Sequence, residues 1–202
     1  MDEKELAKIL NRMGNDMVTL FGVTRSMGMD YAELLKLFGA GGMLLKEPMQ
    51  ISDRLIVEHR SKDGGLLGLR DSGWSPNGLT NDGFASVAGL LLTDVGGTAS
   101  DYVAIGTNTG TFAATQTVLL TETHREAGTG TRVTTTVTND TAQLVRTFSG
   151  YSGTEAVAES GVFNASSGGT MLCRQTFTVL NADWTGGDTL QTTWKIQAKQ
   201  GT

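Results

Sequence analysis

Short segments of alternating apolar and polar residues recur along the second half of the chain, and this period of two strongly limits the fold. The stretch TLQTTWKIQ, residues 189–197, alternates in this way, as it does when successive side chains point to opposite faces of a sheet. The pattern predicts strands over 101–107, 116–126, 131–138, 143–149, 155–163, 170–180 and 187–198. Short strands with no long helices between them predict a mainly β fold, an antiparallel β-sandwich or jelly roll with a helical N-terminal segment.

Composition supports this fold and argues against several functions. The chain has 27 glycines among 202 residues and is rich in threonine, which suits strands joined by tight turns. A net charge of −5 argues against nucleic-acid binding. The longest apolar runs, such as LFGAGGMLL, fall well short of the roughly 20 residues that cross a bilayer. The acidic start MDEKELAK lacks a secretory signal, so we expect a soluble chain made inside a cell.

The first 49 residues follow a helical period instead. The apolar residues that recur there at three- and four-residue steps are Leu6, Ile9, Leu10, Met13, Met17, Leu20 and Phe21 in a first helix and Leu34, Leu35 and Phe38 in a second. This face could pack on the protein's own core or dock on another protein, because methionine adapts to irregular surfaces. If the face docks on another protein, these apolar residues are the candidate contacts with that partner.

Two further elements complete the predicted organisation. The sequence SKDGG between QISDRLIVEHR and LLGLRDSG indicates a β-hairpin. Residues 79–92 indicate a helix capped by Thr80 or Asn81, with Val87, Leu90 and Leu91 facing inward. The predicted domains are therefore a helical docking segment (1–49), a hairpin connector (50–76) and a β-sandwich (77–202).

The stretch GVFNASSGGTMLCRQTF, residues 161–177, resembles a phosphate-binding loop at first sight. A phosphate loop would lead into a helix and carry a lysine, whereas a strand follows here. The two glycines instead suit the bend of a hairpin. Such a hairpin places Glu159 close to Arg174, which makes them a predicted structural pair that stabilises by a fraction of a kcal/mol when exposed.

The residues that could carry catalysis are few and scattered. Cys173 is the single cysteine, and the two histidines, His59 and His124, lie in predicted strands without a cluster of metal ligands. In TETHRE (121–126), neighbouring side chains point to opposite faces, so a structural salt bridge is the better interpretation. GTNTGT (106–111) lacks the helix and basic residue of a nucleotide loop. We therefore expect no catalytic, cofactor or metal site.

Beyond these separate features, three stretches of the chain resemble one known group of proteins. LTNDGFASVAGLLLTDVGGTASDYVAIGTNTGTFAATQTVLLTETHR, AVAESGVFNASSGGTMLCRQTF and GDTLQTTWKI are similar in order and spacing to a module of small structural proteins of tailed bacteriophages. The resemblance covers about residues 77 to 197, over half of the chain. It implies a virion protein with no catalytic residues, commonly a homotrimer.

Two functions are compatible with this resemblance. The first is a capsid decoration or head-fibre subunit that docks on the major capsid protein or another virion protein through its N-terminal helices. The second is a tail-fibre or receptor-binding module that recognises a host surface glycan. Exposed Tyr102, Tyr151, Trp74 and Trp184 could stack on sugar rings in the second case. Scattered aromatic residues are, however, more often core or rim residues.

Overall fold

The computed structural model describes residues 49–75, 78–91 and 96–199, all of which belong to the compact unit Pro48–Thr202. The apolar residues of the two expected N-terminal helices, from Leu6 to Phe38, lie outside the described residues.

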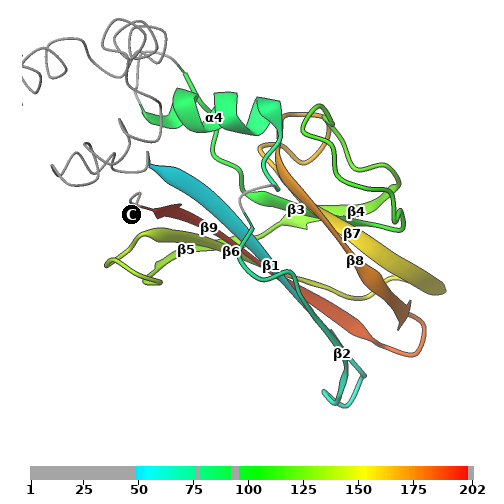
Figure 1. Ribbon diagram of the computed structural model, residues 1–202. Helices are drawn as coiled ribbons and strands as arrows, with labels where there is room; N and C mark the ends of the chain where they lie inside the picture. The colour runs from blue at the N-terminus through cyan, green and yellow to red at the C-terminus, as the bar shows by residue number, and fades with distance from the viewer. Residues whose placement is uncertain (1–48, 76–77, 92–95, 200–202) are drawn as a thin grey trace, which may run out of the picture. The chain divides into compact units, whose positions relative to one another are not determined.

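The described chain is mainly β, with two antiparallel sheets and one short helix. Its elements are β1 (Gln50–Arg60), β2 (Leu66–Asp71), α4 (Asn81–Leu91), β3 (Tyr102–Gly106), β4 (Glu122–Ala127), β5 (Thr129–Val133), β6 (Thr141–Phe148), β7 (Thr154–Phe163), β8 (Met171–Asp183) and β9 (Thr189–Lys199). The five-stranded sheet has the order β2-β1-β9-β6-β5, and the four-stranded sheet has the order β4-β3-β7-β8 (Figure 1).

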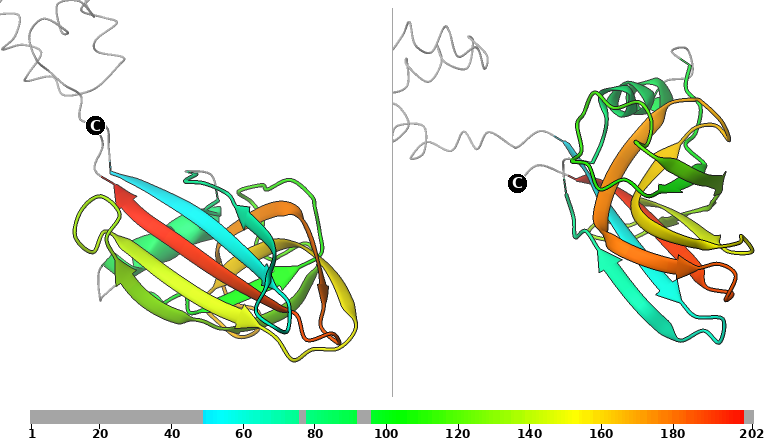
Figure 2. Two further views of the ribbon diagram at one scale, coloured as in Figure 1. Left: turned by 90° about the horizontal axis from the view of Figure 1, so that it is seen from below. Right: turned by 90° about the vertical axis from the view of Figure 1, so that its right-hand side faces the viewer.

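The predicted hairpin β1–β2 is present, but it is not a connector ahead of the main domain. β1 pairs with β9 along its whole length, from Gln50 opposite Lys199 to Arg60 opposite Thr189. The boundary expected at residue 77 therefore does not separate two bodies, because the hairpin belongs to the five-stranded sheet. Its turn lies at the end of the sheet away from α4 (Figures 1 and 2).

Helix α4 begins as the sequence predicts. The hydroxyl of Thr80 accepts the backbone N–H of Gly83 at 2.9 Å, which makes Thr80 the N-cap. Gly83 is the buried residue of the helix, and a Cβ on it would lie 2.0 Å from the carbonyl oxygen of Leu172. Only glycine therefore allows α4 to approach β8 this closely.

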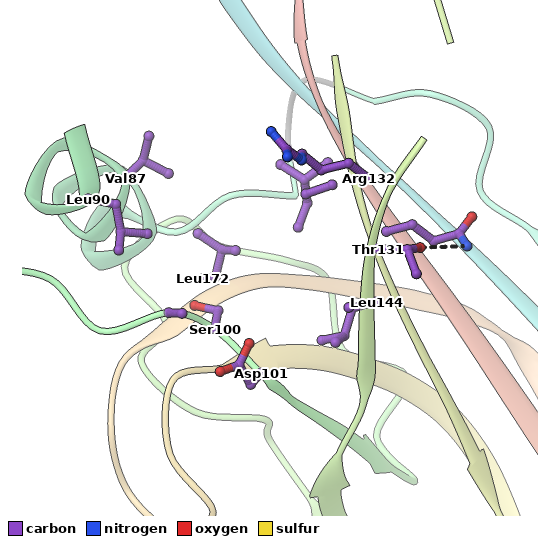
Figure 3. A pocket seen from close by; sticks show the side chains of 13 residues that line it. Val87, Leu90, Ser100, Asp101, Thr131, Arg132, Leu144 and Leu172 are labelled. Atoms are coloured by element: carbon purple, nitrogen blue, oxygen red, sulfur yellow. Dashed lines mark hydrogen bonds between the residues drawn. The ribbon is translucent and has the colours of Figure 1, made fainter. Parts of the chain in front are cut away.

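The expected inward face of α4 is only partly correct. Val87 is half-buried and packs against the core, but Leu90 and Leu91 are 52% and 68% exposed. Leu90 lies seven residues after Gly83 and shares its face, yet it lines a groove rather than the core (Figure 3). Leu91 lies further around the helix.

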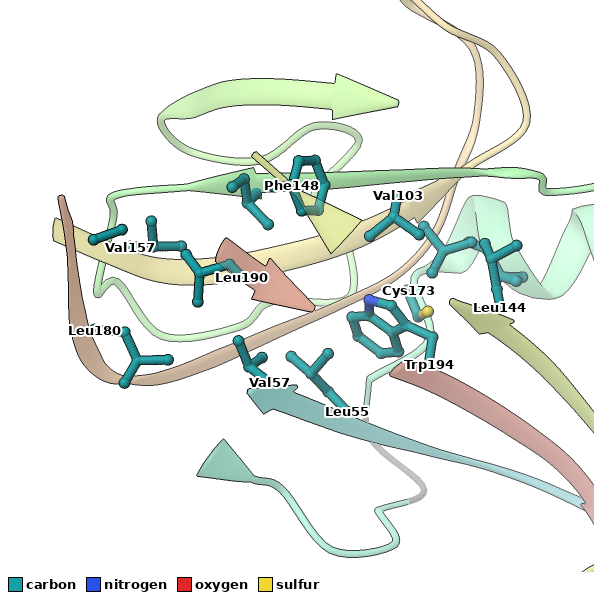
Figure 4. Close-up of a cluster of buried hydrophobic side chains, with 14 of the residues drawn as sticks. Leu55, Val57, Val103, Leu144, Phe148, Val157, Cys173, Leu180, Leu190 and Trp194 are labelled. Carbon is teal, nitrogen blue, oxygen red and sulfur yellow. The ribbon is translucent and has the colours of Figure 1, made fainter. Parts of the chain in front are cut away.

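One core cluster joins the two sheets. Alternate residues of β1 and β9, such as Leu55, Val57, Leu190 and Trp194, pack against residues of the four-stranded sheet such as Val103, as Figure 4 shows. The indole of Trp194 is fully buried. The period of two in the sequence therefore corresponds to side chains that lie between the sheets.

The strand predicted over 116–126 forms only in its second half, as β4. Before it, the backbone N–H groups of Leu120 and Thr121 donate to the carboxylate of Glu159 at 3.2 and 2.7 Å. These N–H groups are thus satisfied by a side chain rather than by a neighbouring strand. The segment before Glu122 is consequently a loop.

The strand predicted over 131–138 also ends early, at the end of β5. Here too a carboxylate accepts the backbone N–H groups that a neighbouring strand would otherwise bind. The carboxylate of Asp140 accepts the backbone N–H groups of Thr135, Thr136 and Val137 at 2.9 to 3.0 Å. A carboxylate that collects successive N–H groups stabilises a turn. The alternating threonines there consequently form a loop.

Candidate functional site

The structure brings Glu159 and Arg174 together inside the fold. Arg174 Nε donates to Glu159 Oε2 at 2.7 Å, and both side chains are fully buried. They are diagonal neighbours across the β7–β8 pair, because Arg174 lies opposite Gly161 and Glu159 lies opposite Thr176. Burial makes this ion pair energetically different from an exposed cross-strand pair, since an unpaired charge there would be costly.

The same pair organises the loop between β3 and β4. The guanidinium of Arg174 donates to Gln116 Oε1 at 3.2 Å and to the carbonyl oxygen of Gly110 at 3.0 Å, while Glu159 holds the backbone at Leu120 and Thr121. These hydrogen bonds join the pair to both ends of the loop. The arrangement is a structural anchor for residues 107–121.

The two histidines lie in separate places, each beside one carboxylate. His59 Nε2 lies 2.7 Å from Asp188 Oδ2 and ties β1 to the β8–β9 turn. His124 Nε2 lies 3.1 Å from Glu155 Oε2, and its ring stacks on Tyr151 with a centroid distance of 3.7 Å. Within the described ranges, no three His, Cys, Asp or Glu side chains are grouped to hold a metal ion.

The charged residues of TETHRE pair with their surroundings. Arg125 forms an ion pair with Glu122 three residues away and donates to the carbonyl oxygen of Gly168 at 2.7 Å. Glu126 contacts Arg146 and the hydroxyl of Tyr151. These contacts fix the β7–β8 turn and the β6–β7 connection, which is the structural role that the sequence favours.

Cys173 is fully buried in the core. Burial, with the nearby charge of Asp53, raises the pKa of its thiol well above the usual range. A nucleophilic cysteine needs the opposite shift, toward the thiolate. Cys173 therefore serves as a small core residue.

Asp53 is a buried carboxylate that holds the chain between β2 and α4. It accepts the backbone N–H of Gly78 at 3.1 Å and the side-chain amide of Gln175 at 2.8 Å, and its own backbone pairs with Ser75. Burial raises its pKa, an effect that the hydrogen bonds from Gln175 and Gly78 oppose. Burial raises the pKa because it removes water from the charged form of the carboxylate.

Replacing Asp53 with asparagine is expected to remove a pH dependence of stability. Because the folded-state pKa is raised, the contribution of Asp53 is full below the ordinary carboxyl pKa of about 4 and is lost as the pH rises through the folded-state pKa. Asparagine keeps an acceptor for Gly78 without ionising. Urea unfolding from about pH 3 to about pH 8 should show Asp53→Asn gaining stability relative to the wild type as the pH rises, then levelling off. A pH-independent difference would contradict this assignment.

The aromatic residues expected to bind sugar rings are not freely exposed. Trp184 is buried, with 3% exposure, and its Nε1 donates to Glu155 at 2.9 Å. Trp74, Tyr102 and Tyr151 are half-buried, and Tyr151 is covered by the ring of His124. The expectation of exposure is therefore wrong for Trp184, and the alternative interpretation as core or rim residues fits all four aromatic residues.

Apolar surface is found instead beside α4. A groove of about 520 Å³ lies between α4, residues 99–101 and the five-stranded sheet. Its apolar lining includes Val87, Leu90, Leu144 and Leu172 (Figure 3). The groove can hold apolar side chains, and its lining contains only one acid and one base, Asp101 and Arg132.

A second apolar surface lies on β2, at the far end of the molecule from α4 (Figure 1). Leu66, Leu67 and Leu69 are 54%, 57% and 50% exposed, and we call these three residues the β2 leucine strip. Neither surface was predicted from the sequence. The run of apolar residues in LLGL, residues 66–69, could have indicated the strip, because its partner strand β1 already alternates.

Comparisons of the chain with models of protein families, with curated proteins and with solved structures find no match. In the part of the chain that the structure describes, no helix is long and apolar enough to cross a membrane.

Proposed function

We propose that the chain is a structural protein of a bacteriophage virion, a capsid decoration or head-fibre subunit whose two sheets form a β-sandwich. It is made in the host cytoplasm, assembles as a homotrimer and docks on the major capsid protein or another virion protein through residues 1–49. It is not an enzyme and uses no cofactor.

The proposal rests on one observation: the candidate catalytic groups are used inside the fold, whereas large apolar side chains are exposed. The groups that would be needed for catalysis hold the fold together: Glu159 with Arg174, His59 with Asp188, and Cys173 in the core. Large apolar side chains are exposed instead, on β2 and α4. Exposed apolar patches mark sites of interaction with other proteins, so these two surfaces support a role in binding proteins.

A stiff fold also suits attachment to a particle. Side-chain hydrogen bonds of the Glu159–Arg174 pair fix the β3–β4 loop, and those of Asp140 fix the β5–β6 loop. A rigid subunit loses little conformational entropy when it binds. A trimer that engages three sites further gains avidity, because its second and third contacts are intramolecular.

Deleting residues 1–49 is expected to abolish incorporation into particles while the remaining chain still folds. β1 begins at Gln50, so the deletion removes no residue of a described strand. The measurement is the amount of full-length and truncated chain in particles purified from the same infected cells, with urea unfolding as the check of folding. A full-length Val137→Asp variant, changed at an exposed residue of the β5–β6 loop, is the control and should incorporate normally. A truncated chain that incorporates as well as the full chain would refute the docking role.

A further inference from the structure

The β2 leucine strip lies on a sheet edge with no neighbouring strand among the described residues. β2 ends the five-stranded sheet and pairs on one side with β1, from Ile56 opposite Asp71 to Arg60 opposite Leu66. An edge strand presents backbone N–H and C=O groups in a row and is a template for pairing with another chain. Natural edges usually carry charges, proline or a cover that prevents this.

Two of the other three sheet edges have polar protection of this kind. β4 carries Glu122, Arg125 and Glu126, and β5 is a short strand of threonine, glycine, arginine and one valine. Neither strand has an exposed large apolar side chain. These edges discourage contact with another strand.

The fourth edge, that of β8, is covered by the chain itself. Leu79 forms a bridge to Cys173, and the neighbouring Thr80 donates its N–H to the carbonyl oxygen of Leu172 at 3.1 Å. Further along β8, Arg70 donates to the carbonyl oxygens of Thr178 and Val179. Among the four described edges, β2 is thus the one that combines an open side with exposed leucines.

The β2 leucine strip is supported by β8 of the other sheet. A Cβ on Gly68, in the middle of the strip, would lie 2.7 Å from Leu180 of β8, so β2 packs closely against the other sheet. The side chain of Arg70 anchors β2 to the β8 carbonyl oxygens at 2.9 and 3.2 Å. The leucines are therefore presented by a fixed strand, which reduces the entropy that a partner contact would cost.

The charges around the strip favour a partner of the same kind. Two of the acids beside it are paired within the chain, Asp71 with Arg54 and Glu58 with Arg60. The adjacent β1–β2 turn adds one exposed charge of each sign, Lys62 and Asp63. A second copy of the chain brings the same mixture of charges, so two strips can approach without facing a surface of a single sign.

We infer that β2 is the surface through which copies of this chain assemble, with the β2 leucine strip of one copy packed against the same strip of its neighbours. The inference rests on the proposed structural role and specifies where the contact within the oligomer lies. Burial of Leu66, Leu67 and Leu69 supplies the apolar contact, and the open edge of β2 supplies hydrogen-bonding groups at its margin.

The test is the native mass of the purified full-length chain by sedimentation equilibrium, for the wild type and two double variants. The variant Leu67→Lys/Leu69→Lys places charges on the strip, where both residues are exposed, so folding should be unaffected. The variant Leu90→Lys/Leu91→Lys changes a matched pair of exposed leucines on α4. Urea unfolding checks that each variant is folded.

We expect the wild type and the α4 variant to be oligomers and the β2 variant to dissociate. Each buried leucine accounts for roughly tenfold in affinity, so self-association should weaken about a hundredfold or more. A monomeric wild type, or an oligomer that persists in the β2 variant, would overturn the inference. A monomeric wild type would also refute the proposed homotrimer, whereas the virion role itself fails only if the wild-type chain is absent from particles.

Discussion

Replacing Trp194 with alanine is expected to lower the free energy of unfolding by about 3–5 kcal/mol. The indole is fully buried and lies in the core cluster that both sheets share, as Figure 4 shows. Its Nε1 donates to Ser160 Oγ at 3.0 Å, which links β9 of one sheet to β7 of the other. Alanine would leave a cavity and remove this link. Equilibrium unfolding in urea measures the loss.

The variant Trp194→Phe is the matched control for that experiment. Phenylalanine keeps an aromatic ring in the core but cannot donate to Ser160, so a smaller loss of stability is expected than for alanine. A Trp194→Ala protein within about 1 kcal/mol of the wild type would show that the two sheets do not depend on this residue, contrary to the core described above.

Replacing Arg174 with alanine is expected to cost about 3–5 kcal/mol of folding free energy, because the carboxylate of Glu159 would remain buried without its partner. Both side chains are fully buried. The loss should be accompanied by loosening of residues 107–121, since Arg174 also holds Gln116 and Gly110. Urea unfolding gives the free energy, and faster amide hydrogen exchange at Thr121 reports on the loop.

Two comparison variants separate this effect from the general loss of an arginine. Arg54→Ala breaks an ion pair with Asp71 whose side chains are 30% and 35% exposed, and it should cost no more than about 1 kcal/mol. The double variant Glu159→Gln/Arg174→Met removes both buried charges and should be less destabilised than Arg174→Ala. Equal losses for Arg54→Ala and Arg174→Ala would contradict the anchoring role of the buried pair.

The features that short segments determine were predictable from the sequence. The β7–β8 turn is an example, because Gly168 and Gly169 adopt φ values of +59° and +71°, and glycine favours that region without help from the rest of the chain. The cap of α4 at Thr80 is confirmed for the same reason. The antiparallel, mainly β character is also confirmed, because each strand shows its own alternation, although the pairing of strands such as β1 with β9 joins residues far apart in the sequence.

One wrong prediction, the strand over 131–138, fails through the local contacts of Asp140 with the N–H groups of Thr135, Thr136 and Val137, whereas the others depend on residues far apart in the sequence. Glu159 takes the N–H groups of Leu120 and Thr121, and a separation of about 40 residues hides this competition from any periodicity. The burial of the Glu159–Arg174 pair likewise follows from the loop that folds over it. The groove beside Leu90 is lined by α4, residues 99–101 and strands β5 and β6, which lie in separate parts of the sequence.

The most direct test of the proposed virion role is to quantify the wild-type chain in highly purified phage particles by mass spectrometry against labelled peptide standards. The account predicts a fixed number of copies per particle, a multiple of three, that remains bound after separation on a density gradient. A chain found only in the particle-free fraction of the lysate would contradict the proposal that it is a structural part of the virion.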